Sequence, residues 1–138
     1  MKIDAVAKVK RSRISGKVQA ISAKAELHRI IICSALSGGV CDISYVGTLS
    51  DDVLATIRCA VAGGAGVDVR EALGGGIISV KPGFGSAEYP HFDCAESGST
   101  LRFMLPVAAA MGFPRGARFA GRGRLPQRPI AELMRPLA

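Results

Sequence analysis

The order helix, strand, helix occurs twice along this 138-residue chain, and this repetition constrains the fold more than any other feature. Apolar residues at helical spacing predict four helices, at Glu26–Leu36, 51–62, Arg102–Met111 and Pro129–Leu137. The strand-like stretches VCDISYVG and GARFAG separate the members of the two pairs. Laying residue 29 on residue 102 aligns the halves at an offset of 73 residues, with few identities. The pattern predicts a duplicated unit that combines helices with strands.

The second of these helices has the clearest boundaries. Ser50 is a favourable cap, and Asp51 and Asp52 place negative charge in the first turn, where the helix is partially positive. A glycine pair follows its end. Beyond it, GVDVREALGGGIISVKPG predicts a hairpin with a glycine turn. Near the N-terminus, Ile3–Val9 and Gly16–Ile21 alternate apolar and polar residues, which predicts two short strands.

The formal net charge of +7 favours anionic partners: nucleic acid, a membrane surface or phosphorylated metabolites. Proteins that grip single-stranded nucleic acid usually interleave aromatic residues with their cations, and this chain has no Trp, 2 Tyr and 5 Phe. No apolar run approaches the ~20 residues of a membrane span. The basic N-terminus lacks the apolar core of a signal peptide. We therefore expect a cytoplasmic protein without nucleic-acid or membrane partners.

The four cysteines are far apart and form no C-x-x-C pair. Cys33 and Cys59 fall within apolar helical faces, so we expect buried, free thiols in a reducing compartment. Neither His28 nor His91 has a partner at metal-ligand spacing, and neither receives a role. The sequence predicts no metal site and no cofactor.

Two helix N-termini combine cations with small residues. In SAKAELHR, Lys24 and Arg29 precede an apolar run, and in AESGSTLRF, Gly98 and several hydroxyls precede Arg102. Because the first N–H groups of a helix have no partners within it, such ends bind anions, and nearby cations strengthen the site. Lysine supplies a point charge, and arginine supplies a planar fork for phosphate or carboxylate. The alternative is that these cations only face solvent.

A third basic stretch is GRGRLPQRP, residues 121–129, which we call the arginine loop. It places Arg122, Arg124 and Arg128 among glycine and proline residues before the last predicted helix. This composition indicates a shaped loop and not a helix face. A loop of this kind can close over an anion, although loop arginines are often merely exposed.

Together, GKVQAISAKAELHR, LSDDVLAT, AESGSTLRF and GRGRLPQRPI resemble the 5-enolpyruvylshikimate-3-phosphate (EPSP) synthase family in order and spacing. The family implies an α+β fold of two lobes, each built from β-α-β-α-β-β units, with the active site between them. This chain would hold about one and two-thirds units of the N-terminal lobe. Residues 1–21 would supply strands that pack with the other lobe, 22–94 the first unit and 95–138 an incomplete second unit. A chain that stops within a unit is expected to be a fragment.

The resemblance also implies roles for individual residues. Those expected to bind shikimate 3-phosphate are Lys24, Ala25 and Arg29. Those expected to bind phosphoenolpyruvate are Lys24, Gly98 and Arg124. Those expected to support the site are Asp51, Ser97, Ser99 and Arg102. The implied reaction transfers an enolpyruvyl group to a hydroxyl of shikimate 3-phosphate, with the catalytic acid and base in the missing lobe. The fragment alone is therefore expected to be inactive.

Several positions depart from the family pattern. Ala25 stands where the family usually has a serine that contacts shikimate 3-phosphate, and Ile21 replaces a proline or glycine. Glu96 stands where an amide is common, and a carboxylate beside an anionic substrate is unfavourable. Arg122 and Gly123 replace a more usual acidic or small pair. These changes indicate either a divergent branch or a degraded copy.

Other functions stay open. The sister family that transfers enolpyruvyl to UDP-N-acetylglucosamine shares the fold, but typically has asparagine after the lysine and a reactive cysteine near the arginine loop. Here Ala25 follows the lysine, and no cysteine lies between Gly116 and Ala138. A polyanion-binding module, or half of an assembly with a separate chain, is also compatible with the motifs. We expect the full-length protein to be a monomer and the fragment to self-associate.

Overall fold

The computed structural model describes residues 7–135. In chain order its elements are α1 (Lys24–Leu36), β1 (Cys41–Val46), α2 (Asp51–Ala62), β2 (Gly66–Ala72), β3 (Gly75–Lys81), β4 (His91–Asp93), α3 (Gly98–Met111), β5 (Arg118–Ala120), the 3-10 turn η1 (Leu125–Gln127) and α4 (Ala131–Met134). Helices and strands alternate through both halves, which confirms the predicted mixed α/β class.

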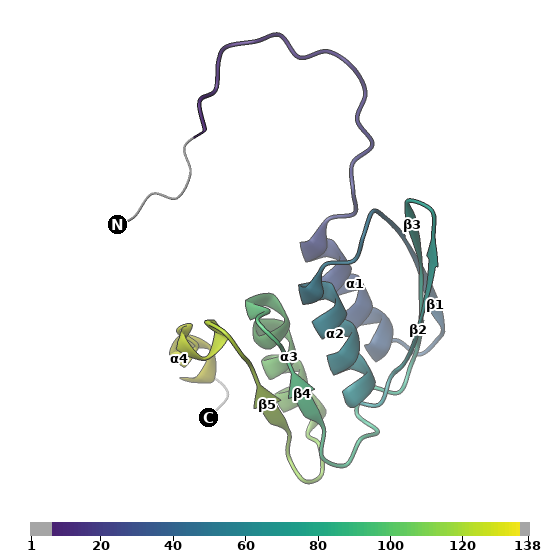
Figure 1. The fold of residues 1–138 in the computed structure, drawn as a ribbon. Helices are drawn as coiled ribbons and strands as arrows, with labels where there is room; N and C mark the ends of the chain where they lie inside the picture. The colour runs from purple at the N-terminus through teal and green to yellow at the C-terminus, as the bar shows by residue number, and fades with distance from the viewer. Residues whose placement is uncertain (1–6, 136–138) are drawn as a thin grey trace.

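Two small sheets flank a set of neighbouring helices. Strands β1, β3 and β2 form an antiparallel sheet in that order, in which β2 and β3 are the predicted hairpin. Strands β4 and β5 pair in parallel, and α3 connects them. Figure 1 shows α1 and α2 side by side against the three-stranded sheet, with α3 on the other side of α2. Helix α2 is therefore the central element of the fold.

A single core joins the two halves of the chain. Its most buried large side chains come from five different elements: Ile31, Val53, Ile78, Phe92 and Met104. All of these residues belong to one contiguous hydrophobic cluster. Burying an apolar side chain of this size contributes about 1.5–3 kcal/mol, so the second half depends on the first for its stability.

The two halves also close in the same way. The backbone N–H of Ser22 donates to the carbonyl of Val46 at the end of β1, at 2.9 Å. The N–H of Cys94, just after β4, donates to the carbonyl of Ala120 at the end of β5, also at 2.9 Å. These matching bonds lie close to the offset found in the sequence. The repetition is therefore structural as well as sequential.

The predicted strand at Gly16–Ile21 is wrong. Residues 7–21, which we call the arm, contain no strand and extend away from the helices (Figure 1). A strand forms only when its backbone pairs with a neighbouring strand. The edge of β1 that β3 leaves free bonds to Ser22, just after the arm, and residues 7–21 pair with no strand. Of the other predicted strand, Ile3–Val9, residues 7–9 are not in a strand and the rest lie outside the described residues.

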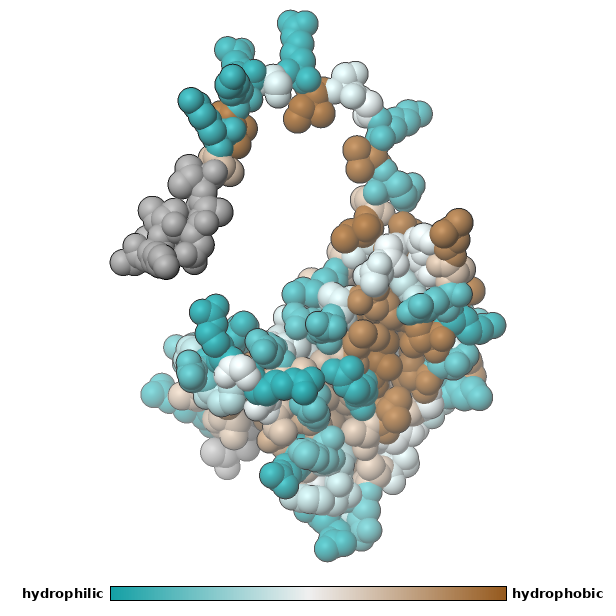
Figure 2. All heavy atoms as spheres, in the orientation of Figure 1, coloured by the Kyte–Doolittle hydropathy of each residue, from teal (hydrophilic) through white to brown (hydrophobic). Residues whose placement is uncertain are grey.

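Figure 2 shows hydrophobic and hydrophilic side chains alternating along the arm. Ile14 and Val18 are 95% and 94% exposed. Their alternation fits a strand, but no packed surface covers their apolar face. The alternation marks an apolar face that could pack against a partner, and no described residue covers that face.

Element boundaries shift where the sequence signals were weak. Helices α1 and α3 begin earlier than predicted, at Lys24 and Gly98, and the strand β4 was not predicted. Helix α4 covers Ala131–Met134, and the end of the predicted helix lies outside the described residues. No helix in the described part of the chain is both long and apolar enough to cross a membrane.

The cysteine predictions are partly right. All four are free thiols, as expected, and Cys59 is fully buried. Cys33 is exposed, which corrects the expectation that it lies in the core. Helix α1 buries the face that contains Leu27 and Ile31, and Cys33 lies two positions beyond Ile31, on the opposite side of the helix.

Candidate functional site

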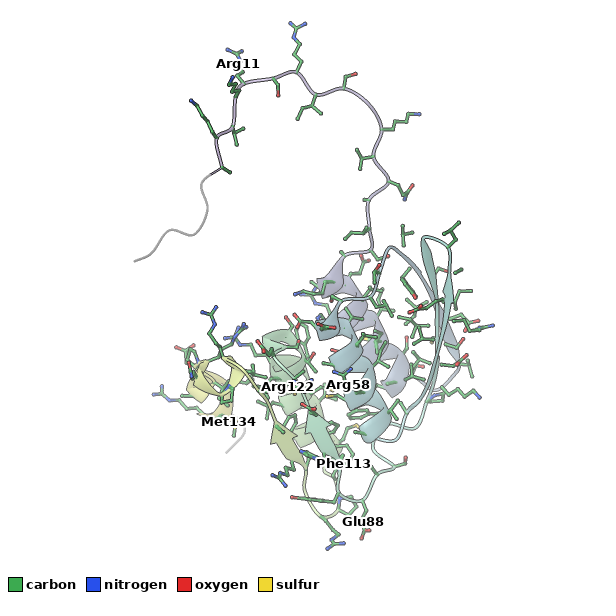
Figure 3. The ribbon with its side chains drawn as sticks, in the orientation of Figure 1. Arg11, Arg58, Glu88, Phe113, Arg122 and Met134 are labelled. Carbon is green, nitrogen blue, oxygen red and sulfur yellow. The ribbon has the colours of Figure 1, made fainter. Side chains whose placement is uncertain are left out.

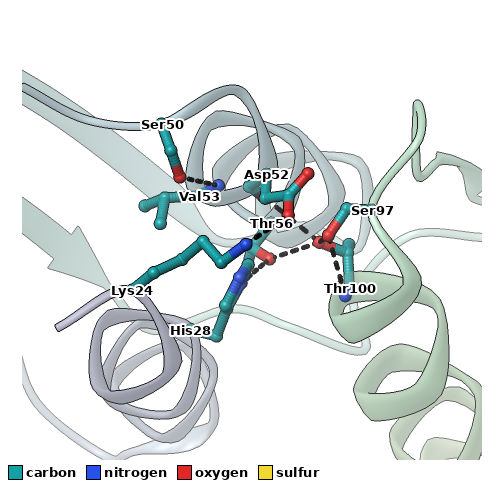
Figure 4. Close-up of polar contacts among 8 residues, drawn as sticks. All are labelled: Lys24, His28, Ser50, Asp52, Val53, Thr56, Ser97 and Thr100. Carbon is teal, nitrogen blue, oxygen red and sulfur yellow. Dashed lines mark hydrogen bonds and ion pairs between the residues drawn. The ribbon is translucent and has the colours of Figure 1, made fainter. Parts of the chain in front are cut away.

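The N-terminal ends of α1, α2 and α3 meet at one end of the helical layer. Lys24 begins α1, Asp51 begins α2 and Gly98 begins α3. Hydrogen bonds between side chains and backbone join these ends (Figure 4). Because each end carries unpaired N–H groups and partial positive charge, their convergence favours an anion. The fold thus brings together two stretches that the sequence marked separately as candidate anion sites.

Lys24 is held at this junction by Asp52. Its Nζ donates to Oδ2 of Asp52 at 2.8 Å, and the two side chains are 52% and 30% exposed. An ion pair this exposed contributes little to stability, so its main effect is to hold the ammonium beside the start of α2. Half of the lysine side chain stays open to solvent and to a ligand. The sequence singled out Asp51 as the supporting acid, whereas Asp52 is the residue that contacts Lys24.

The side chain of Arg29, on α1, extends toward Phe103 of α3. Its guanidinium carbon is 5.6 Å from the centroid of the Phe103 ring, and its Nη1 donates to the carbonyl of Ala25 at 3.4 Å. A guanidinium over an aromatic face is attracted by the ring electrons. Arg29 is nevertheless exposed, so its remaining N–H groups are available to a ligand.

Four buried side chains connect the three helices beneath these cations (Figure 4). His28 Nδ1 lies 2.6 Å from Thr56 Oγ1, which lies 2.7 Å from Thr100 Oγ1. Thr100 Oγ1 is also 2.7 Å from Ser97 Oγ and 3.2 Å from the carbonyl of Asp52. His28, Thr56, Ser97 and Thr100 are all 0% exposed. We call these four residues the buried polar chain.

Burial lowers the pKa of His28 below its usual value, because a charged imidazole would lose its hydration. The Asp52 carboxylate opposes this effect, and the cations Lys24 and Arg29 add to it. His28 is therefore neutral near pH 7.

The arginine loop folds back on the turn before α3. The N–H of Arg122 donates to the carbonyl of Ala95 at 2.8 Å, and the N–H of Arg128 closes η1 on Leu125 at 3.0 Å. A Cβ placed on Gly98 would lie 2.5 Å from Nη1 of Arg128. The missing side chain at Gly98 therefore lets the Arg128 guanidinium approach the start of α3.

Of the other predicted site residues, Ala25, Ser97 and Ser99 lie at the starts of α1 and α3. Ala25 is exposed in the first turn of α1, Ser97 caps α3 by accepting from the N–H of Thr100, and Ser99 is half-buried beside it. Arg124 is exposed and precedes η1. Arg102 faces α4, where it lines a pocket with Glu132 and Arg135. The pocket that Arg102 lines is therefore formed with α4 and not with Lys24.

A second, polar pocket opens between α2 and the arginine loop. Its lining includes Arg58 of α2 and Arg122 of the arginine loop, which are both labelled in Figure 3. Three carboxylates share this pocket with the two arginines, those of Asp51, Asp52 and Glu96. The three carboxylates offset the two arginines, so the lining of this pocket does not favour an anion.

Reasoning from the sequence assigned no site role to His28, Thr56 or Asp52, and it named Arg128 only as one of three loop arginines. The only available signal was spacing: His28 lies four residues after Lys24, on the same face of α1. Within residues 7–135, no group of three or more His, Cys, Asp or Glu side chains could hold a metal ion.

The sequence model of the EPSP synthase family (3-phosphoshikimate 1-carboxyvinyltransferase) matches residues 8–138. A 3-phosphoshikimate 1-carboxyvinyltransferase of Clostridioides difficile (strain 630) is 40% identical over 131 residues, covering 89% of this chain and 29% of its own length. A relative of the same name from Clostridium beijerinckii is 37% identical over 127 residues, covering 89% and 28%.

A third such protein, from Clostridium kluyveri, is 35% identical over 120 residues, covering 86% of this chain and 26% of its own length. The chain therefore spans between a quarter and a third of the curated relatives it matches. The family match covers nearly all of the described residues, including the three converging helices. On this evidence of sequence, the chain belongs to the EPSP synthase family.

Proposed function

We propose that the protein takes part in enolpyruvyl transfer from phosphoenolpyruvate to the 5-hydroxyl of shikimate 3-phosphate, giving 5-enolpyruvylshikimate 3-phosphate and phosphate. The observation that carries the proposal is the convergence of three helix N-termini on Lys24, with Arg29 and the arginine loop beside them. This junction offers positive charge of the kind that two phosphates and a carboxylate require. The names of the relatives describe the same reaction.

Within this site we assign shikimate 3-phosphate to the α1 side, at Lys24, Ala25 and Arg29. Phosphoenolpyruvate takes the α3 side, between Lys24, Gly98 and the arginines of the loop. The half-exposed ammonium of Lys24 can serve both ligands. Of the loop arginines, Arg124 was the predicted contact, and Arg128 is the one packed on Gly98. Both therefore belong in a test of donor binding.

The reaction needs more than these anion clamps. The donor double bond is protonated, the acceptor hydroxyl adds to the adjacent carbon, and phosphate is eliminated, so a general acid and base are required. We place these groups in the part of the relatives' length that this chain does not match. Residues 1–138 then contribute anion-binding groups, from about one and two-thirds units of one lobe. By themselves they release no phosphate from phosphoenolpyruvate.

Ala25 should weaken this site. A serine hydroxyl at that position would donate to the phosphate, and losing a hydrogen bond to a charged acceptor costs about 1.5–3 kcal/mol. We expect Ala25→Ser to bind shikimate 3-phosphate about tenfold or more tightly than the wild type. We further assign the protein to the cytoplasm, where its four free thiols would stay reduced.

The test is calorimetric titration of the 138-residue chain with shikimate 3-phosphate, in comparison with inorganic phosphate and UDP-N-acetylglucosamine. Lys24→Ala should weaken binding about ten- to a hundredfold. The matched control is Lys81→Ala, which removes an exposed lysine from β3, and it should leave binding unchanged. Equal affinity for all three ligands, with steep dependence on salt, would instead identify a polyanion-binding module.

A further inference from the structure

The buried polar chain has a direction that follows from counting protons. Thr100 Oγ1 donates toward two acceptors, Ser97 Oγ at 2.7 Å and the carbonyl of Asp52 at 3.2 Å, so its single hydroxyl proton is committed to these two. The 2.7 Å contact between Thr56 and Thr100 must then use the proton of Thr56. With its own proton committed, Thr56 can only accept from His28, whose Nδ1 lies 2.6 Å away.

His28 must therefore carry a proton on Nδ1. In the neutral imidazole the other nitrogen, Nε2, is then an acceptor with a free lone pair. Nε2 is buried and has no hydrogen-bond partner among the described residues. The ring lies near Phe103 of α3, with centroids 6.3 Å apart. The anchoring contact of this histidine is thus its Nδ1–H.

The buried polar chain connects the α1 side and the α3 side of the proposed site. The carbonyl of Asp52 belongs to the residue whose carboxylate holds Lys24. Thr100 also contacts Ser97, whose hydroxyl caps α3 next to Gly98. A displacement of Thr56 or Thr100 would therefore move the α1 and α3 sides of the site relative to each other.

We propose that His28 is a positioning residue: by donating from Nδ1 to Thr56 it fixes, through Thr100, the capped turn at Gly98 relative to Lys24. The role in binding rests on the proposed function, whereas the tautomer and the order of the turn do not. His28 touches no substrate in this scheme.

Two substitutions of His28 by amide residues distinguish the role of Nδ1 from that of Nε2. The Asn side-chain nitrogen lies the same number of bonds from Cβ as Nδ1 of histidine, and the Gln nitrogen lies nearly as far out as Nε2. His28→Asn can therefore still donate to Thr56, whereas His28→Gln cannot donate from that position. A second matched pair keeps or removes the next hydroxyl, Thr56→Ser and Thr56→Val.

The first measurement needs no substitution. A long-range ¹H–¹⁵N NMR spectrum of the 138-residue chain at pH 7 reports which nitrogen of His28 carries the proton. The charged groups that face His28 are Lys24 and Arg29 on α1 and Asp52 on α2, and α3 contributes the uncharged ring of Phe103. A neutral ring protonated on Nδ1 supports the proposal. A ring protonated on Nε2, or on both nitrogens, overturns it.

The second measurement is the affinity for shikimate 3-phosphate. We expect His28→Asn and Thr56→Ser to stay within about twofold of the wild type, and His28→Gln and Thr56→Val to bind about tenfold more weakly, the effect of one buried hydrogen bond. Equal affinity in wild type and His28→Gln would overturn the positioning role and leave the proposed function standing.

If the wild type does not bind shikimate 3-phosphate, the proposed function fails and the positioning role is read from the amide signals of Ser97, Gly98 and Thr100. These signals should shift or broaden in His28→Gln and keep their positions in His28→Asn. Unchanged signals in His28→Gln would show that His28 does not order the turn. Should His28→Gln not fold, the Thr56 pair and the wild-type tautomer decide the question.

Discussion

Gly98 shows how a single missing side chain shapes the site. Its backbone does not require glycine, since it has no positive φ, but a Cβ there would lie 2.5 Å from Nη1 of Arg128. That atom is the far end of a flexible side chain, so Gly98→Ala should move the arginine and leave the fold intact. Glycine therefore serves the approach of a cation and not a turn.

We predict that Gly98→Ala weakens phosphoenolpyruvate binding about tenfold, the effect of one charge-assisted hydrogen bond, and changes shikimate 3-phosphate binding much less. Titration with each ligand separates the two effects. The matched control is Gly38→Ala, because a Cβ on Gly38 meets nothing within 4 Å. Unchanged affinity for phosphoenolpyruvate would place the donor away from Gly98.

The contact residues around Lys24 were only partly predictable. Lys24, Arg29, Gly98 and the loop arginines stand out in the sequence because charge and glycine are visible there. Asp52 could not be chosen over Asp51, because their difference lies in which side of α2 turns toward α1, and this depends on how the two helices pack.

At the scale of the element, the N-terminal caps of α2 and α3 differ in their surroundings. Ser50 is exposed and accepts from the N–H of Val53 at 3.5 Å. Ser97 is fully buried and contacts both the N–H and the hydroxyl of Thr100, at 3.1 and 2.7 Å. A cap lost to solvent can be replaced by water, whereas a buried partner stays unsatisfied.

We therefore predict that Ser50→Ala lowers the free energy of unfolding by about 1 kcal/mol or less. Ser97→Ala should lower it by about 2–3 kcal/mol, because Thr100 also loses a buried partner. Urea denaturation of both variants measures the difference. Equal losses would mean that the buried polar chain adds nothing to the cap.

His28 makes stability depend on pH. Because its folded-state pKa lies below the unfolded value of about 6.5, the unfolded chain takes up a proton first as the pH falls. The contribution of His28 is thus complete above pH ~6.5 and declines as the pH falls through that value toward the folded pKa. We predict a smaller loss of stability between about pH 7 and pH 5 in His28→Asn than in the wild type. Identical pH profiles from thermal denaturation would contradict the assignment.

Elements with strong local signals were predicted well. Helix α2 follows Ser50 and its two aspartates, and the β2–β3 hairpin turns at the expected glycines. The arm shows the opposite case: its alternating residues at Gly16–Ile21 are a strand signal, yet a strand depends on a partner that the segment itself cannot specify. Local pattern therefore predicted the type of element, and tertiary contacts decided whether it formed.

At the scale of the whole molecule, two similar halves share one core, and the segment that precedes each half is paired in one and unpaired in the other. In the second half, β4 leads into the bond between Cys94 and Ala120 and pairs with β5. In the first half, the bond between Ser22 and Val46 is present, but the arm leading into it is not paired. The exposed apolar residues of the arm thus correspond in chain order to β4 of the second half, but they pair with no strand.

The arm should therefore affect association and not stability. Replacing two fully exposed residues in the double variant Ile14→Ser, Val18→Ser should change the free energy of unfolding by no more than about 0.5 kcal/mol. The same variant should sediment as a smaller species than the wild type, because exposed apolar surface promotes self-association. As a core control, Ile78→Val removes one buried methyl group and should cost about 1 kcal/mol. A loss above about 1 kcal/mol in the arm variant would show that these side chains pack on the folded body in solution.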